Sequence, residues 1–470
     1  MSIRAAEVEV QNLTLGRACG WYVLEIPDGN TNVSAISSAL DHAADHVGQP
    51  TFINIKTEIG RGTSIAGTCK AHHAAFGHDN VKQCKRLWGY DPEETHVVPD
   101  DVRQYWSEVP KKGERTHREW QDLLGEYALQ YPKLAKRFRQ LADGTLDQGW
   151  RQDLLSLKAP EKDTPIRQSS AAVFDALWKT LPFFGGSADL SEPNNVLREP
   201  KVAFGPKDNV SHQSYEGRYV HYGTREHAMA AISNGIAAYS SRDEDESRGQ
   251  SLIPITATFS MFQLYAAPAI RMGALMSLQI IHIGTHDSIA EGACGPTHQV
   301  SQNLIFPKRQ NANGSQPVEL INLWRSMPNL LHIRPCDAEE AIGAWIMAID
   351  HKGPSVLGLN RGAVPLQKGT DRIKMQRGAY VIVEDDDAKV TLVSTGSEVS
   401  QCVEAAKVLR EGGIRARIVS MPSMRRFEQQ DQEYILSVLP LDGRPVVSVE
   451  AMSMHGWARW YVGGLFSCLL

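Results

Sequence analysis

The sequence predicts an α/β protein of several domains built on parallel sheets. The chain has 470 residues, too many for one hydrophobic core, and the usual size of roughly 100–200 residues per domain suggests about three domains. Apolar segments typical of strands alternate with segments whose apolar residues recur at helical spacing. A strand–helix–strand order places the two strands parallel, with a right-handed crossover.

The composition excludes several classes of protein. Hydrophobic residues make up 42% and charged residues 22%, with 54 acidic against 49 basic side chains, so there is no basic excess of the kind that nucleic-acid binding requires. The first residues, MSIRAAEVEVQNL, do not form a signal peptide, and no apolar run reaches the ~18–20 residues of a membrane span. The seven scattered cysteines include no CxxC pair, which argues against a disulfide framework and a zinc site. We therefore expect a cytoplasmic protein with neither nucleic acid nor membrane as a partner.

The first domain is expected at residues 1–157 and begins with a strand–helix–strand unit. Gly20–Ile26 reads as a buried strand, and TFINIKT from Thr51 reads as the next strand. Between them lies a helix behind the cap candidates Thr31 and Asn32. The apolar face of this helix is Val33, Ile36, Leu40, Ala44 and Val47. Two strands alone would leave a strand edge of the sheet exposed, so we expect this domain to be prone to aggregation.

A long amphipathic helix is expected further along the first domain. The pair Thr116 and Glu119 has the T-x-x-E spacing of a capping box, which would start the helix at this point. Its apolar face is formed by Trp120, Leu123, Leu124, Tyr127, Leu134, Phe138 and Leu141. Pro132 should kink or split the helix, because proline cannot donate the backbone hydrogen bond.

Two further α/β domains are expected at residues 158–365 and 366–470. The polar, proline-punctuated stretch Lys158–Ile166 marks the boundary before the second domain, which alternates strands such as Leu278–Ile283 with helices such as Ala228–Ala238. The third begins with AYVIVED and TLVSTGS, continues through a helix over Val403–Leu409 and the strand ARIVSMP, and stops abruptly. The last ten residues, YVGGLFSCLL, read as an abnormal terminus.

Two features of the second domain have the residue types of a cofactor site. Glu226, in YGTREHAMAAISNG, falls in the first turn of a predicted helix, where a carboxylate ordinarily stabilises the helix dipole. Phe259, Phe262 and Tyr265 recur every three residues and would line one side of a helix or loop–helix. Such a stripe belongs to a core more often than to a cofactor site, so both interpretations stay open.

A glycine-rich loop with two histidines follows the apolar strand LQIIHI. His286 and His298 lie in GTHDSIAEGACGPTHQ, at the carboxyl end of a parallel strand, where open α/β sheets bind ligands. Metal binding is the obvious alternative, but the spacing of the two histidines, with Asp287 nearby, fits no tight metal motif. Proton exchange with a polar substrate is the interpretation that we favour.

Six motifs in one order resemble the transketolase family. They are GGSADL from Gly185, REHAM, the FxxFxxY run, THDSI, GPTHQ, and STGSEV with SMPS in the third domain. The resemblance extends from about residue 15 to about Trp457. It implies the thiamine-diphosphate-binding fold, with a remnant of the diphosphate-binding domain, a pyrimidine-binding central domain and an incomplete transketolase-type C-terminal domain.

The resemblance assigns roles on the cofactor side of the site. Thiamine diphosphate, with Mg²⁺ at its diphosphate, is the implied cofactor and carries the carbanion chemistry. Glu226 matches the glutamate that hydrogen-bonds the pyrimidine, and an apolar pocket would raise its pKa. Phe262, with Phe259 and Tyr265 beside it, matches the aromatic wall packed on the pyrimidine. His72, in AGTCKAHHAAFG, matches a histidine near the cofactor, and Asp189 in GGSADL a nearby residue that could equally cap a turn.

On the substrate side, the resemblance implies a sugar phosphate. His286 and His298 match histidines near the sugar hydroxyls. Arg167, in TPIRQSS, and Arg361, in LGLNRGAVP, match arginines that hold the phosphate through bidentate pairing. An exposed arginine at a helix N-terminus is the alternative for Arg167.

Several positions depart from the family pattern. Cys294 stands where an aspartate of the family contacts a donor hydroxyl, and a thiol is a weak hydrogen-bonding group. The loop after GGSADL reads SEPNN, whereas the family has a shorter version with a serine; this removes a phosphate contact and leaves Asn194 as its stand-in. The sequence contains no GDG motif followed by the asparagine that holds Mg²⁺ and the diphosphate, so the metal and diphosphate ligands are expected to be absent from this chain. We therefore expect a chain truncated at the N-terminus and at the C-terminus.

Three functions follow from the resemblance. The first is transfer of a two-carbon ketol unit from a ketose phosphate to an aldehyde, in a homodimer. The second is a catalytically inactive chain that works only by pairing with a complete family subunit. The third is the dihydroxyacetone synthase branch, whose acceptor is formaldehyde. The segment CKAHHAAFG of this chain is similar to the AKAHHAAFG-like variants that are typical of this branch. A peroxisomal location would suit that branch, although the chain has no SKL-type ending.

Overall fold

The computed structural model describes residues 13–72, 76–147, 149–197, 202–207, 213–239, 251–287, 320–460 and 466–469. The chain forms two compact units, unit 1 (Met1–Asp122) and unit 2 (Leu123–Leu470). None of the helices in these described ranges combines the length and the apolar character that crossing a bilayer requires.

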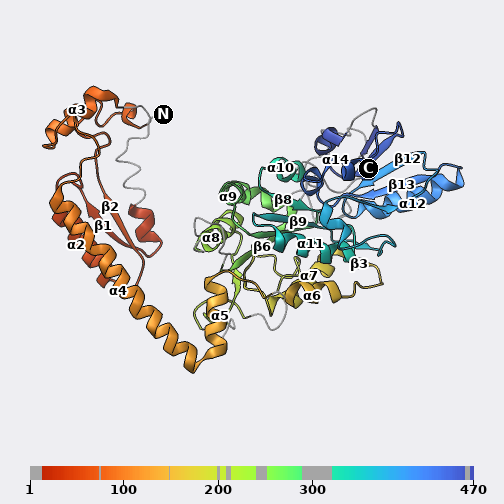
Figure 1. Ribbon diagram of the computed structural model, residues 1–470, viewed down its shortest axis with the longest axis horizontal. Helices are drawn as coiled ribbons and strands as arrows, with labels where there is room; N and C mark the ends of the chain where they lie inside the picture. The colour runs from red at the N-terminus through yellow and green to blue at the C-terminus, as the bar shows by residue number, and fades with distance from the viewer. Residues whose placement is uncertain are drawn as a thin grey trace. The chain divides into compact units, whose positions relative to one another are not determined.

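Unit 1 is built on a small parallel sheet of two strands (Figure 1). Its elements are β1 (Tyr22–Ile26), α2 (Val33–Asp45), β2 (Thr51–Ile55), the 3-10 turn η1 (Cys69–Ala71), α3 (Gly77–Leu87) and most of α4 (Asp100–Gln130). The predicted strand–helix–strand unit is confirmed, since β1 and β2 pair in parallel register from Tyr22–Thr51 to Ile26–Ile55. Asn32 is the cap of α2 and accepts from the backbone N–H of Ala35 at 3.0 Å.

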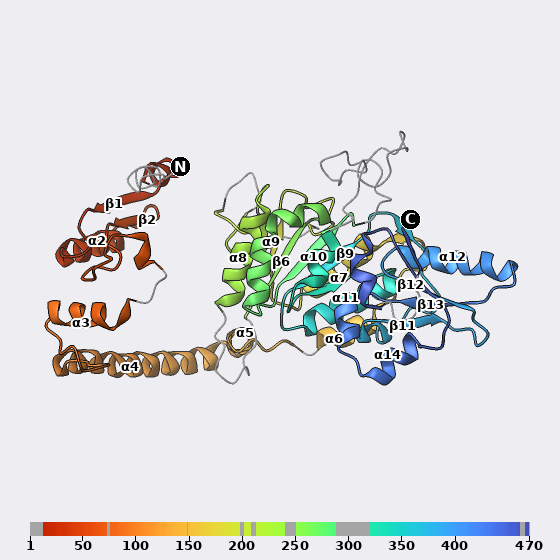
Figure 2. The same cartoon turned by 90° about the horizontal axis from the view of Figure 1, so that it is seen from above.

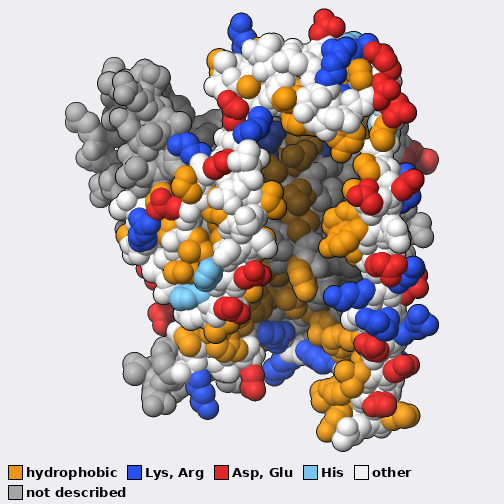
Figure 3. All heavy atoms as spheres, turned by 90° about the vertical axis from the view of Figure 1, so that its left-hand side faces the viewer, with side chains coloured by type: hydrophobic (Ala, Val, Ile, Leu, Met, Phe, Trp, Pro, Cys, Tyr) orange, Lys and Arg blue, Asp and Glu red, His pale blue; other side chains and the backbone are white. Residues whose placement is uncertain are grey.

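The burial predicted for unit 1 is wrong. Only Ile26 of β1 is buried, and β2 has no buried residue. On the expected apolar face of α2, Val33 is 72% exposed and Leu40 is 58% exposed. A parallel strand normally has both faces covered, and a two-stranded sheet with one helix cannot provide that cover. Hydrophobic side chains are consequently visible among charged ones on the face of the molecule that presents this unit (Figure 3).

The helix predicted from Thr116 begins earlier. Helix α4 spans 31 residues from Asp100, with Pro110 inside it, so Thr116 and Glu119 form no capping box. None of its residues is buried, and the predicted apolar face is exposed at Trp120 (43%). Pro132 does divide the segment, because it occupies the first turn of α5 (Pro132–Ala142), where its missing N–H costs nothing.

Unit 2 contains a six-stranded sheet in the order β5-β4-β6-β7-β9-β8, with parallel pairing throughout. The strands of this sheet are β4 (Phe183–Ser187), β5 (Tyr219–His221), β6 (Ile253–Phe259), β7 (Ile281–Thr285), β8 (Leu331–Ile333) and β9 (Ser355–Leu359). The helices around it are α6 (Gly149–Ser156), α7 (Ile166–Trp178), α8 (Glu226–Ala238), η2 (Ser260–Phe262), α9 (Gln263–Leu275), α10 (Leu320–Ser326) and α11 (Ala338–Asp350). The strand predicted at Leu278 begins three residues later, at Ile281.

Helices cover both faces of this sheet (Figures 1 and 2). Residues of α7 and α11, including Phe174 and Trp345, pack with alternate strand residues such as Ile281 and Ile283 in one cluster. Helices α8, α9 and α10 pack on the opposite face, where Val356 of β9 joins them. Period-2 alternation along parallel strands thus produces two apolar layers.

A second, five-stranded sheet follows in the order β11-β13-β12-β14-β15. A separate short ladder is formed by β3 (Thr164–Pro165) and β10 (Ala363–Val364). The strands of the five-stranded sheet are β11 (Tyr380–Val383), β12 (Val390–Ser394), β13 (Ala416–Ser420), β14 (Val446–Glu450) and β15 (Phe466–Leu469). The helical segments of this region are η6 (Lys374–Arg377), α12 (Glu398–Glu411), α13 (Met424–Glu428), α14 (Gln432–Val438) and η7 (Met454–Trp460). Strand β11 runs antiparallel to β13, and the others pair in parallel. The predicted α/β character of the third domain is confirmed.

Replacing Trp345 with alanine should destabilise unit 2 strongly. Its side chain is fully buried against Phe174 and Phe183, with ring centroids 5.5 and 5.8 Å away, and its Nε1 donates to Ser170 at 2.9 Å. A cavity of that size costs about 3–5 kcal/mol. Trp106→Ala is the matched control, because Trp106 is 61% exposed and should change stability by less than about 0.5 kcal/mol. Scanning calorimetry of the two variants measures the difference; equal unfolding temperatures would contradict this packing.

Candidate active site

The site lies where parallel strands of the six-stranded sheet end. Phe259 is the last residue of β6, His286 directly follows β7, and Arg361 comes two residues after β9. Because all strands of this sheet point the same way, these residues emerge at one edge. That edge is the general ligand-binding position of open α/β sheets.

The aromatic stripe is part of this edge. Phe259 is buried, with its ring stacked on Phe262 at 5.9 Å between centroids, and Phe262 lies 6.2 Å from Tyr265. Exposure increases along the stripe, from 7% at Phe259 to 66% at Tyr265, with Phe262 half-buried. The stripe therefore reaches from the core to the surface, as a wall of a binding site would.

His286 is packed against the base of this wall. Its ring centroid lies 3.8 Å from that of Phe259, and the residue is 8% exposed. Its Nδ1 lies 2.8 Å from the hydroxyl of Thr285. The backbone has a φ of 59°, which non-glycine residues rarely adopt and which is typically retained at functional positions.

Glu226 begins α8 at the same edge of the sheet. Helix α8 follows β5, α9 follows β6 through η2, and the two helices pack together, so Glu226 and Phe262 lie at the same end of a helix pair. The carboxylate is half-buried, and it occupies the first turn, where the helix dipole favours an anion.

The two candidate phosphate-binding arginines start from adjacent backbone. The N–H of Arg167 donates to the carbonyl of Asn360 at 3.3 Å, and the Asn360 side chain accepts from the N–H of Ile166 at 3.2 Å. These contacts adjoin the antiparallel pair of β3, which ends just before Ile166, and β10, which begins at Ala363. Arg167 also donates to the carbonyl of Pro193, so it is not simply a solvated side chain at the end of a helix. Arg361 is exposed.

The remaining predicted residues differ in their surroundings. Asp189 is exposed, with a φ of 59° in the loop after β4. His72 belongs to unit 1, where it is exposed and ends the turn η1. Cys294 and His298 lie outside the described residues. Asn194 is 2% exposed and uses both ends of its amide, accepting from Thr285 at 2.5 Å and donating to Ser187 at 3.1 Å.

A buried ionic network that sequence patterns did not predict borders the site. Arg334, fully buried after β8, donates from Nε to Asp287 Oδ2 at 2.9 Å. Its other nitrogens bind Glu398 at 2.5 and 3.1 Å and the carbonyl of Thr395 at 2.9 Å. The sequence feature that could have revealed this network is Arg334 itself, a charged residue directly after an apolar strand and before a proline.

The network continues to Glu450. This carboxylate accepts two bonds from Arg325, at 2.8 and 2.6 Å, and one from Trp457 at 2.8 Å. Burial raises the pKa of Glu450, but Arg325 and then Arg334 outweigh that effect and hold the pKa at about 2. Since this is below the ordinary 4.5, the ionised group stabilises the fold above pH 4.5, and that contribution is lost as the pH falls through about 2.

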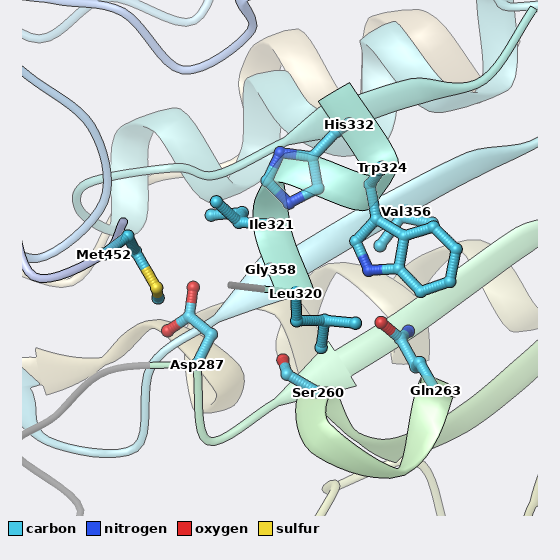
Figure 4. A pocket seen from close by; sticks show the side chains of 10 residues that line it. All are labelled: Ser260, Gln263, Asp287, Leu320, Ile321, Trp324, His332, Val356, Gly358 and Met452. Atoms are coloured by element: carbon cyan, nitrogen blue, oxygen red, sulfur yellow. The ribbon is translucent and has the colours of Figure 1, made fainter. Parts of the chain in front are cut away.

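Asp287 is held less firmly than Glu450. Burial raises its pKa above the ordinary value, and Arg334 offsets only part of that. Its second oxygen, Oδ1, and the Nε1 of Trp324 are buried without a hydrogen-bond partner among the described residues. Both side chains line a cavity of about the size of one water molecule, next to His332, whose pKa burial keeps well below its ordinary value (Figure 4).

Three profiles of one family match the chain in succession. They are the transketolase thiamine diphosphate binding domain at residues 9–147, the transketolase pyrimidine binding domain at 162–306 and 309–367, and the transketolase-like C-terminal domain at 378–467. The chain belongs to the transketolase family. The fold and the resemblance predicted from the sequence are thereby confirmed.

Individual members of the family are similar over nearly all of this chain. It is 37% identical to a dihydroxyacetone synthase of Candida boidinii over 95% of the chain, and 36% identical to a transketolase of Scheffersomyces stipitis over 94%. Among solved structures, a Pichia stipitis transketolase in complex with sedoheptulose 7-phosphate gives a TM-score of 0.84 at 35% identity, covering 96% of this chain. A Leishmania mexicana transketolase gives 0.83 at 35% identity and covers 99%.

The chain is shorter than these relatives. It spans 61% of the dihydroxyacetone synthase, 62% of the Scheffersomyces transketolase and 63% of each of the two solved chains.

Removing the charge of Arg334 should destabilise unit 2. Arg334→Met leaves Asp287 and Glu398 buried without their counter-charge, which costs about 3–5 kcal/mol. Arg410→Met is the control, because the Arg410 side chain is 66% exposed and its partner at 3.1 Å, Asp385, keeps a second partner in Arg415, so the pair is worth at most about 1 kcal/mol. Urea unfolding followed by tryptophan fluorescence compares them; if Arg334→Met is as stable as Arg410→Met, the network contributes nothing to stability.

Proposed function

We propose that this chain contributes the pyrimidine side of a thiamine-diphosphate site that transfers a two-carbon ketol unit from a ketose phosphate to an aldehyde. The observation that carries the proposal is the placement of His286 against Phe259, with the Phe262 ring stacked beyond it, at the strand edge where Arg361 also emerges. A flat ring, a proton-exchanging group and an anion-binding group are thereby available at one edge.

The residues present fit the pyrimidine end of the cofactor. Phe262 is half-buried, so part of its ring is available for stacking, and the half-buried carboxylate of Glu226 begins a neighbouring helix. When bound, thiamine diphosphate supplies the electron sink for the two-carbon unit. Glu226 would share a proton with a ring nitrogen of the pyrimidine. Phe262 would exclude water from the face of the ring, and Tyr265 would form the outer rim.

On the substrate side, His286 would exchange a proton with a sugar hydroxyl, since an imidazole titrates near neutral pH. Arg167 and Arg361 would hold the phosphate, for which a guanidinium has the matching geometry. His298 and Cys294 would contact the substrate. His72 would lie near the cofactor, and Asp189 would lie at the rim of the site.

A partner subunit is the second part of the proposal. The diphosphate and Mg²⁺ would be held by residues of another chain, in a homodimer or with a longer family member. The exposed strands of unit 1 support this, because β1 and β2 have only one buried residue between them and parallel strands need cover on both faces. If no partner restores activity, the chain would be an inactive family member.

The acceptor aldehyde separates the two branches of the family. Identities of 37% and 36% to a dihydroxyacetone synthase and a transketolase do not discriminate between formaldehyde and an aldose phosphate. Assaying both acceptors with one ketose phosphate donor decides between the two.

Calorimetric titration with thiamine diphosphate and Mg²⁺ tests cofactor binding. We expect saturable binding by the chain, alone or mixed with a full-length relative, and at least about tenfold weaker binding after Glu226→Ala, because a hydrogen bond to a charged group is worth about 1.5–3 kcal/mol. Glu404→Ala is the control, since Glu404 is 69% exposed in α12. Absence of binding in both settings would refute the proposal.

Arg361 provides a separate test of the substrate class. Arg361→Ala should raise the KM for a ketose phosphate about 10- to 100-fold, because it removes a charged hydrogen bond to the phosphate. The KM for an unphosphorylated ketose should not change. Arg415→Ala, which removes an exposed arginine paired with Asp387 at 3.0 Å, should leave both values unchanged. Equal effects of Arg361→Ala on the two ketoses would rule out phosphate recognition by this residue.

A further inference from the structure

A row of four buried hydrogen bonds connects His286 to a backbone carbonyl in the centre of the sheet. Thr285 lies 2.8 Å from His286 Nδ1 and 2.5 Å from the side-chain oxygen of Asn194. Asn194 in turn lies 3.1 Å from the hydroxyl of Ser187, which lies 3.0 Å from the carbonyl oxygen of Ala257. Ser187 and Thr285 are fully buried, and Asn194 is 2% exposed.

The carbonyl at the end of this row fixes the direction of every bond. A carbonyl oxygen only accepts, so the hydroxyl of Ser187 must donate to Ala257. The Ser187 oxygen then has only lone pairs left, and these accept from the N–H of Leu190 at 3.2 Å and from Asn194. Asn194 therefore presents its NH₂ to Ser187.

The same reasoning carries the direction on to the imidazole. With its NH₂ facing Ser187, Asn194 turns its carbonyl oxygen to Thr285, which must donate its only hydroxyl proton to it. The oxygen of Thr285 can then only accept from His286. The proton between these two residues therefore belongs to Nδ1 of His286.

Reversing the amide of Asn194 does not give an acceptable alternative. The hydroxyl of Ser187 would then donate to Asn194, and its oxygen would face the carbonyl oxygen of Ala257 at 3.0 Å with no proton between them. That carbonyl already accepts from the N–H of Ala188 at 3.0 Å, so an additional buried oxygen contact would be repulsive. Buried groups of this kind are found satisfied in native proteins.

We propose that Asn194 and Thr285 are positioning residues that hold neutral His286 with its proton on Nδ1, so that Nε2 is the nitrogen that accepts a proton. The left-handed backbone and the contact with Phe259 fix the plane of the ring in the same position. Its consequence for catalysis rests on the proposed function: a substrate hydroxyl gives its proton to Nε2, the alkoxide remains on the sugar, and the imidazolium keeps its Nδ1 bond to Thr285.

The tautomer of His286 can be measured directly in the unmodified protein. Nitrogen NMR of the chain labelled with ¹⁵N-histidine separates protonated from unprotonated ring nitrogens, and His286→Gln identifies the signals among the 16 histidines. At a pH where His286 is neutral, we expect a protonated Nδ1 and an unprotonated Nε2. A protonated Nε2 overturns the proposal.

Variants of Thr285 test whether the row imposes the tautomer. Thr285→Val removes the acceptor at constant shape, so the His286 signals should shift toward a mixture of both tautomers, whereas Thr285→Ser should preserve the signals of the original protein. Thr391→Val is the control, because Thr391 is 1% exposed in the other sheet and its hydroxyl has no hydrogen-bond partner among the described residues. An unchanged tautomer in folded Thr285→Val would show that the row does not set it.

Failure of this inference is distinguishable from failure of the proposed function. The NMR measurement needs neither cofactor nor substrate, so it gives its answer even if thiamine diphosphate does not bind. If ketol transfer is observed while His286 carries its proton on Nε2, only the positioning role is wrong. If both are as proposed, Thr285→Val should lower kcat at least about tenfold and shift its pH profile, and Thr285→Ser should restore both.

Discussion

The guanidinium of Arg334 is the interaction on which the arrangement of unit 2 depends. It is fully buried and connects Asp287, shortly after β7, with Glu398 at the start of a helix on the second sheet. Burying such a charge is costly unless it is paired and hydrogen-bonded, and here five hydrogen bonds reach its three nitrogens. The pairing also constrains its surroundings: a Cβ on Gly396 would lie 2.5 Å from the guanidinium carbon.

This pairing ties the segment that carries His286 to the second sheet, whose elements contribute none of the proposed site residues. Asp287 follows His286 directly, so anchoring Asp287 to the second sheet fixes one end of the short segment that carries the histidine. The other end is fixed by the hydrogen bonding of Thr285. The segment is therefore held from two sides.

Sequence patterns predicted the features that depend on neighbouring residues. Apolar alternation identified the strands, and helical periodicity identified α8. A spacing of three residues identified the aromatic stripe that begins at Phe259, and the position of a loop after a parallel strand located His286. What the patterns could not reveal depends on distant pairs: Arg334 and Glu398 are 64 positions apart, and Thr285 and Asn194 are 91 apart. Helix α4 was misjudged for another reason, because with no buried residue it has no face from which its start could be located.

The hydrogen bonding of His286 begins in the pairing of two strands. Ser187 and Ala257 are register partners of β4 and β6, and a shift of one residue would turn the serine side chain to the opposite face. The tautomer proposed for His286 thus depends on the register of these two strands. An insertion within β4 or β6 would therefore move the proton on the imidazole while leaving His286 itself in place, and so would any change to the loop after β4 that removes Asn194.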